Sequence, residues 1–287
     1  MPINVMQRQI NRLAYNTFKN ARGFSNFSVP HIPRISPQYL KNRFVLMGEE
    51  TNTWYREKGL FDSFINCFPA DDERLEKILQ IDRYDAFCVQ NSKTYGGQLW
   101  TFTRKLYEEK IIKEPLLQNN YLGHCWMNFF TIENCDDKNT AKKKGRSSQD
   151  RELAFNIISK AQKSLVFEIL KIIKPKCILA TIGFRNDDYF NQFALGVNDY
   201  KFLDQISVDS NNIITKEMMK EIKIIDPNHP LHEVKIIQTF HPKHFLGTIN
   251  REDFYEEAKE KLKAKYPELK MSQYYEQVLL EKLRQIV

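Results

Sequence analysis

Short apolar runs alternate along the chain with longer segments of helical period. Four runs predict buried strands, because each is apolar or rich in β-branched and aromatic residues: 44–47, 122–132, 177–183 and 233–242. Glycine ends the first and third runs, and His241–Pro242 ends the fourth. Uninterrupted apolar runs of this kind are typical of parallel strands, which are covered on both faces.

Helical segments precede, separate and follow these runs. The pattern predicts helices over residues 3–20, over most of 59–115, over 152–174 up to Pro175, and in the charged tail from residue 252 onward. Residues 184–232 are polar and give no clear assignment. Because strands alternate with long helices, we expect a three-layer α/β/α fold with a central four-stranded parallel sheet.

The same pattern divides the chain of 287 residues, which is long enough to bury a sizeable core. We expect an N-terminal helix and a proline-containing linker over 1–35, and an α/β domain over 36–255. A C-terminal helical extension over 256–287 is expected to pack on that domain.

Charge, cysteine content and the absence of long apolar runs restrict the kinds of partner and the location to be expected. The net charge of +7 favours a polyanion such as DNA, RNA or an anionic membrane, although a basic protein without such a partner explains it equally well. The five cysteines are scattered and form no CxxC pair. The N-terminus has no apolar core of a signal peptide, and no apolar run reaches 18 residues. We expect a cytoplasmic monomer without cofactor or metal.

Polar residues stand at the end of every predicted strand. The four signals are Gly48-Glu49-Glu50-Thr51-Asn52, Asn128, Gly183-Phe184-Arg185-Asn186 and His241-Pro242-Lys243-His244. In an open α/β sheet such loops converge on one crevice, where a carboxylate, an amide and a histidine can act as base, reader and electrophile. Taken singly, each has a plainer explanation: solvated or helix-capping glutamates, a satisfied buried amide, and a histidine without a task.

These motifs, in this order, resemble those of the uracil-DNA glycosylase superfamily. GEETN, WMN and HPK stand where that family has a glycine-acidic motif, a strand-end asparagine and a His-Pro-Ser motif, and PKCILATIG resembles its middle strand. The resemblance spans residues 40–250. It implies a DNA glycosylase that hydrolyses the N-glycosidic bond of a flipped-out uracil or C5-modified pyrimidine, in DNA repair or anti-phage defence.

The resemblance also implies a role for each matching residue. Glu50 orients the attacking water and offsets positive charge on the sugar, while His241 binds the pyrimidine carbonyl as negative charge builds on the base. Glu49 and Asn52 line the base pocket, and Asn128 reads the pairing edge. Breaking an N-glycosidic bond leaves a positive sugar and a negative base, so fixed groups must stabilise both.

Extrusion of a base from DNA requires an aromatic stacking surface, a wedge and cations that hold phosphates. Phe61 and Phe64 are candidates for stacking, although their spacing of three also suits a helix core. The remaining candidates lie after the fourth strand or in a basic loop: Phe245 or Leu246 as the wedge, and Lys243, His244, Lys142, Lys143 and Lys144 as phosphate contacts. The lysine run is equally well explained as a solvated loop.

The chain departs from the family pattern at three positions. Thr51 replaces a proline, Asn52 replaces the aromatic residue that excludes thymine in strict uracil enzymes, and Lys243 replaces a serine. Unless Trp54 or Tyr55 closes the C5 side, the substrate is expected to carry a C5 substituent. Two alternatives remain: an inactive nucleic-acid-binding protein of the same fold, and an α/β hydrolase or transferase acting on a non-nucleic substrate.

Overall fold

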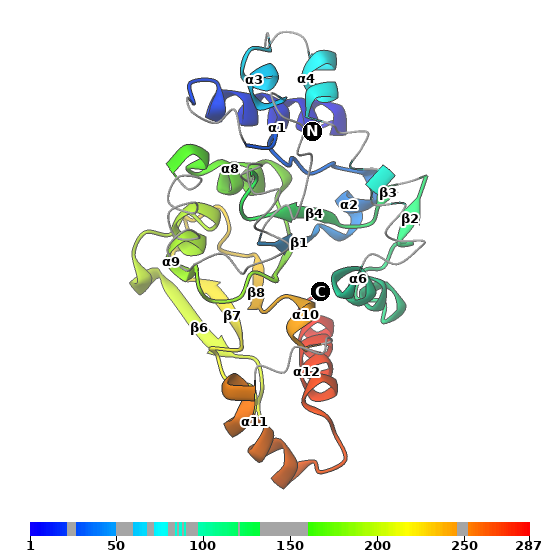
Figure 1. Cartoon of the computed structure of the whole chain (residues 1–287), viewed down its shortest axis with the longest axis vertical. Coiled ribbons are helices and arrows are strands. Elements are labelled where there is room, and N and C mark those ends of the chain that lie inside the picture. Colours follow the sequence, from blue (N-terminus) through cyan, green and yellow to red (C-terminus); the bar gives the residue numbers. More distant parts are fainter. Residues whose placement is uncertain are drawn as a thin grey trace.

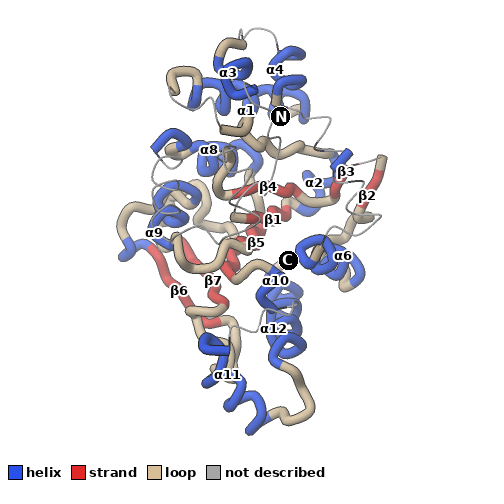
Figure 2. Tube along the Cα trace, viewed as in Figure 1, coloured by secondary structure: helices blue, strands red, loops and turns tan. Residues whose placement is uncertain are grey.

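A mixed six-stranded sheet runs through the middle of the computed structural model, with helices on both faces (Figures 1 and 2). The structure describes residues 1–21, 27–49, 60–67, 72–79, 84, 86–87, 89, 97–119, 121–132, 160–245 and 252–287. The strand order is β4-β1-β5-β8-β7-β6. The strands are β1 (Phe44–Gly48), β4 (Cys125–Asn128), β5 (Cys177–Ala180), β6 (Leu203–Ser207), β7 (Met219–Ile224) and β8 (Lys235–Thr239).

The α/β class is confirmed, and the four predicted strands form as the neighbouring parallel strands β4, β1, β5 and β8. The prediction of a four-stranded sheet is incomplete, because β7 and β6 extend it with antiparallel pairing. The hydrophobic pattern does not predict these two strands, for a physical reason. Strand β6 is a half-exposed edge, and β7 carries Lys220 and Glu221 at buried positions, where ion pairs offset their charge.

Each face of the sheet supports its own core. Along β1, Val45 and Met47 pack toward one face, and Phe44 and Leu46 toward the other. The core on the first face includes α8 (Leu165–Ile173) and α1 (Ile3–Phe18), which contact each other. Helices α3 (Leu60–Ile65) and α4 (Asp72–Ile78) pack on α1 (Figure 1). The second face is covered by α6 (Gln98–Glu108), α10 (Pro242–Phe245), α11 (Glu252–Lys265) and α12 (Met271–Ile286).

Shorter elements connect these layers. Strands β2 and β3 form a separate antiparallel pair. The bounds of the short elements are α2 (Pro37–Asn42), β2 (Leu117–Gln118), β3 (Tyr121–Leu122), α9 (Asp187–Tyr189), η1 (Phe190–Ala194) and η2 (Tyr200–Phe202). No helix within the described ranges is long and apolar enough to cross a membrane.

The two ends of the chain belong to opposite cores. Helix α1 buries Ile10, Ala14 and Phe18 in the core on the first face and contacts α8, α3 and α4. Helix α12 buries Leu279 against the second face. The hydroxyl of Tyr275, also on α12, bonds the Thr239 hydroxyl and donates to the Met218 carbonyl. The C-terminal helix is therefore tied directly to β8 and to the start of β7.

The connections change direction at β1. The chain pairs β4 on one side of β1 and then places β5 on the other side. The loops that leave β1 and β5 therefore diverge, which in open α/β sheets marks the carboxyl ends of these strands as the place where ligands bind.

We predict that removing a buried side chain of α12 destabilises the whole fold. Leu279 is fully buried, so Leu279→Ala should lower the free energy of unfolding by about 2–5 kcal/mol, measured by urea denaturation. Leu269→Ala, at a half-buried position before the same helix, should cost clearly less. Equal losses for the two variants would contradict a core role for α12.

Candidate active site at the carboxyl ends of the parallel strands

Glu49 follows β1 directly and is held by a neighbouring strand end. The Asn186 Nδ2 donates a hydrogen bond to Glu49 Oε1 at 3.0 Å, from the loop that follows β5. Asn186 itself is only 8% exposed. Because β1 and β5 are adjacent and parallel, their carboxyl ends bring the two side chains together. The Glu49 carboxylate is thus fixed by the protein, which the solvated-loop explanation does not predict.

Asn128, the last residue of β4, lies beside Gly48 on β1. Its side chain is buried, and a Cβ atom added to Gly48 would come within 2.6 Å of Asn128 Oδ1. On its other side, Asn128 Nδ2 makes a long hydrogen bond of 3.4 Å to Nδ1 of the buried His31. Burial lowers the pKa of His31 to about 3, so its imidazole is neutral and Nδ1 accepts. Glycine at position 48 is needed for this amide to lie across the end of β1.

His241 follows β8 and is a neutral imidazole with a defined tautomer. The backbone N–H of Lys243 donates to His241 Nδ1 at 3.1 Å, so this nitrogen carries no proton. Burial, with smaller contributions from His244 and Lys243, lowers the pKa of His241 to about 4. At neutral pH the ring therefore presents Nε2–H as a hydrogen-bond donor.

The ends of β5 and β8 interlock beside His241. Gly183 adopts φ of +68° and donates its N–H to the Thr239 carbonyl at 2.9 Å. The Phe240 ring lies against Gly183, where an added Cβ would meet it at 3.3 Å. Phe240 also makes edge contacts with Phe184 at a centroid distance of 5.1 Å. The loops that carry Asn186 and His241 are therefore packed against each other.

Three of the predicted aromatic contacts are wrong. Phe61 and Phe64 are fully buried and make edge contacts with Phe18 of α1 at 5.9 and 6.5 Å, so they are core residues and no stacking surface. Phe245 is also buried and stacks on Tyr275 of α12 at 4.8 Å, so it is no wedge. In each case the ring is buried in a contact between helices. The core explanation already offered for Phe61 and Phe64 is the one observed.

The other predicted residues divide into two groups. Lys243 is exposed and His244 is half-buried in α10, next to His241. The remaining predictions lie outside the described residues: Glu50, Thr51, Asn52, Trp54, Tyr55, Lys142, Lys143, Lys144 and Leu246.

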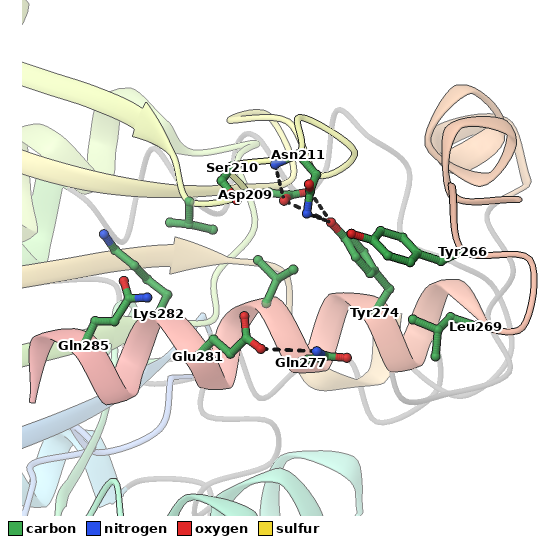
Figure 3. A pocket seen from close by; sticks show the side chains of 12 residues that line it. Asp209, Ser210, Asn211, Tyr266, Leu269, Tyr274, Gln277, Glu281, Lys282 and Gln285 are labelled. Atoms are coloured by element: carbon green, nitrogen blue, oxygen red, sulfur yellow. Dashed lines mark hydrogen bonds between the residues drawn. The ribbon is translucent and has the colours of Figure 1, made fainter. Parts of the chain in front are cut away.

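A cavity of about 380 Å³ lies between α12 and the loop after β6 (Figure 3). Its buried Asp209 accepts hydrogen bonds from the N–H groups of Ile213 and Ile214 and from the Tyr274 hydroxyl. None of the side chains that line it is a buried polar group without a partner. The cavity therefore offers a ligand fewer specific polar contacts than the strand ends do.

Sequence reasoning missed the partners that hold the candidate groups. The sequence places Asn186 at a strand end without indicating its role, and it places His31 in the proline-containing linker. No local pattern indicates either contact, since each joins residues far apart in the chain. Across the described residues, no three His, Cys, Asp or Glu side chains gather as metal ligands would.

No protein-family model, curated protein or solved structure matches the chain. Function is therefore inferred from the geometry of these strand ends and from the sequence motifs.

We predict that Gly48→Ala forces the Asn128 amide out of place. The added methyl would overlap Asn128 Oδ1, so the variant should lose about 1–3 kcal/mol of unfolding free energy. In an Asn128→Ala background the overlap is gone, and the same change should cost much less. Urea denaturation of the four proteins measures this coupling; strictly additive losses would contradict the contact.

We predict that His241 titrates near pH 4 in an NMR titration of its ring proton. Its folded pKa lies below the unfolded value near 6.5, so the unfolded chain binds the proton more tightly between these values. The stability that His241 contributes is present above about pH 6.5 and is lost as the pH falls toward 4. Lys243→Met should raise the midpoint, because it removes a nearby positive charge. A midpoint at 6.5 or above would refute the lowered pKa of His241.

Proposed function

We propose that the protein is a DNA glycosylase that hydrolyses the N-glycosidic bond of a flipped-out uracil or C5-modified pyrimidine and leaves an abasic site. The observation that carries the proposal is the neutral His241 with its Nε2–H donor. It follows the carboxyl end of β8, and Glu49 and Asn128 lie at the carboxyl ends of β1 and β4 in the same sheet. The role is DNA repair or anti-phage defence, and the partner is DNA.

The proposed chemistry needs a donor for the leaving base. As the bond between C1′ and the base nitrogen breaks, negative charge spreads to the pyrimidine carbonyl. A neutral imidazole stabilises that charge through Nε2–H without transferring its proton. Because His241 is partly desolvated and its tautomer is set by the Lys243 N–H, the donor is prepared before the substrate binds.

The opposite charge develops on the sugar. In this proposal Glu50 offsets it and orients the water that attacks C1′, while its neighbour Glu49 shapes the pocket. Support comes from Glu49, whose carboxylate is held by Asn186 at the carboxyl end of β1. Glu49, the residue directly before Glu50, is therefore held in place by the protein.

Recognition of the base is assigned to Asn128. Its amide is buried between Gly48 and His31, so its direction is restrained from both sides. A restrained polar group discriminates strongly between ligands, because a mismatched edge leaves it without a partner in a desolvated place. Lys243, two residues after His241, is exposed and carries positive charge that a phosphate can approach.

The nature of the base is argued from sequence alone. Thr51 and Asn52 stand where the strict uracil enzymes carry proline and an aromatic residue. A smaller residue at position 52 leaves room at C5, so a hydroxymethylated, glucosylated or oxidised pyrimidine is the preferred substrate.

The test is a screen for abasic sites. Duplexes and single strands that carry uracil, hydroxymethylcytosine or its glucoside are incubated with the protein, and abasic sites are cleaved with alkali. Glu50→Gln should reduce base release by about 100-fold or more with DNA affinity retained, because it removes the charge that assists the sugar. Glu233→Gln, at an exposed glutamate, is the matched control and should act like the unaltered protein.

Each result of the screen separates the alternatives. Release of uracil alone would refute the C5-modified substrate. DNA binding without release of any base would favour the inactive binding protein, and indifference to DNA would favour an enzyme with a non-nucleic substrate.

A further inference from the structure

One buried ammonium group lies where strands β6, β7 and β8 meet the loop after β5. Lys220 belongs to β7, and its side chain is only 5% exposed. Its Nζ lies 2.6 Å from Asp187 Oδ2 and 3.1 Å from Gln205 Oε1 on β6. It also lies over the Phe184 ring, 5.0 Å from the centroid. A buried lysine needs such partners, since an unpaired ammonium is strongly disfavoured away from water.

The second oxygen of Asp187 completes the cluster. Gln238 on β8 donates from Nε2 to Asp187 Oδ1 at 2.7 Å and to the Gly183 carbonyl at 2.6 Å. The loop from Gly183 to Asp187 is thus held at its beginning by Gln238 and at its end by both Gln238 and Lys220. Asn186, the residue before Asp187, is the one that holds Glu49.

We propose that Lys220 is a positioning residue, which anchors the Gly183–Asp187 loop through Asp187 and thereby holds Asn186 against Glu49. Lys220 touches neither Glu49 nor a ligand, and it acts through the loop. The effect on base release rests on the proposed function, whereas the effect on the Asn186–Glu49 contact does not.

The contact can be observed without any substrate. In protein labelled with ¹⁵N-asparagine, the side-chain amide signal of Asn186 reports its bond to the Glu49 carboxylate. Glu49→Gln replaces that carboxylate and gives the reference position of the weakened contact. Lys220→Met should move the Asn186 signal toward this reference, whereas Lys220→Arg, which keeps the charge, should move it less.

The matched control breaks another ion pair of the same strand. Lys282 of α12 pairs with the buried Glu221 of β7 at 2.7 Å, on the face away from the Gly183–Asp187 loop. Lys282→Met should therefore destabilise the protein without moving the Asn186 signal. Because Lys220→Met leaves Asp187 without its cation, the double variant Lys220→Met with Asp187→Asn removes both charges and is judged by the same criterion.

The outcome separates the two proposals. An Asn186 signal unchanged in Lys220→Met and in the double variant would overturn the positioning role. In single-turnover base release, Lys220→Met should slow the rate by up to about 100-fold with the Kd for DNA unchanged, and Lys220→Arg should restore part of it. A wild-type protein that releases no base, while the Asn186 signal moves as expected, would overturn the proposed function and leave the positioning role standing.

Discussion

The pairing of β1 between β4 and β5 is the constraint on which the candidate site depends. Parallel pairing brings the carboxyl ends of β4, β1 and β5 to the same end of the sheet. The change of direction at β1 separates the loop after β1 from the loop after β5. Asn128, Glu49 and Asn186 come from these three strand ends, although they are far apart in the chain. A one-residue shift in register would reverse the faces of β1, exchanging Val45 and Met47 for Phe44 and Leu46 in the two cores. The site and both cores therefore depend on the same register.

Glycine at the end of β1 shows how closely this edge is packed. Asn128 Oδ1 occupies the space where a side chain at position 48 would begin. At the end of β5, Gly183 combines a positive φ with a close approach of Phe240. Both glycines allow one strand end to lie against the next, which brings polar groups together in a place with little water. Under those conditions each hydrogen bond is stronger, and each missing one is more costly.

The sequence was sufficient to predict the parallel strands and the residues at their ends, because apolar runs that end in glycine or His-Pro are local signals. It was insufficient for β6 and β7. Lys220 and Glu221 look like surface residues until their partners Asp187 and Lys282 are known, and those partners lie 33 and 61 positions away. The same limit applies to Phe61 and Phe245, whose contacts with α1 and α12 depend on tertiary packing. A pattern read along the chain records which residues are apolar, and it does not record which helix covers them.

Buried charge in the antiparallel extension is difficult to explain by stability alone. A buried ion pair is often no more stabilising than an apolar pair of the same size, whereas loss of one partner costs about 3–5 kcal/mol. Strand β7 nevertheless carries Lys220 toward one face and Glu221 toward the other, each with a partner from a different element. Each pair links β7 to a different element of the fold. On one face the segment so linked is the loop that holds Glu49, and on the other it is the C-terminal helix that packs against β8. Strand β7 is thus linked on one face to the loop that carries Asn186 and on the other, through α12, to the end of β8 that precedes His241.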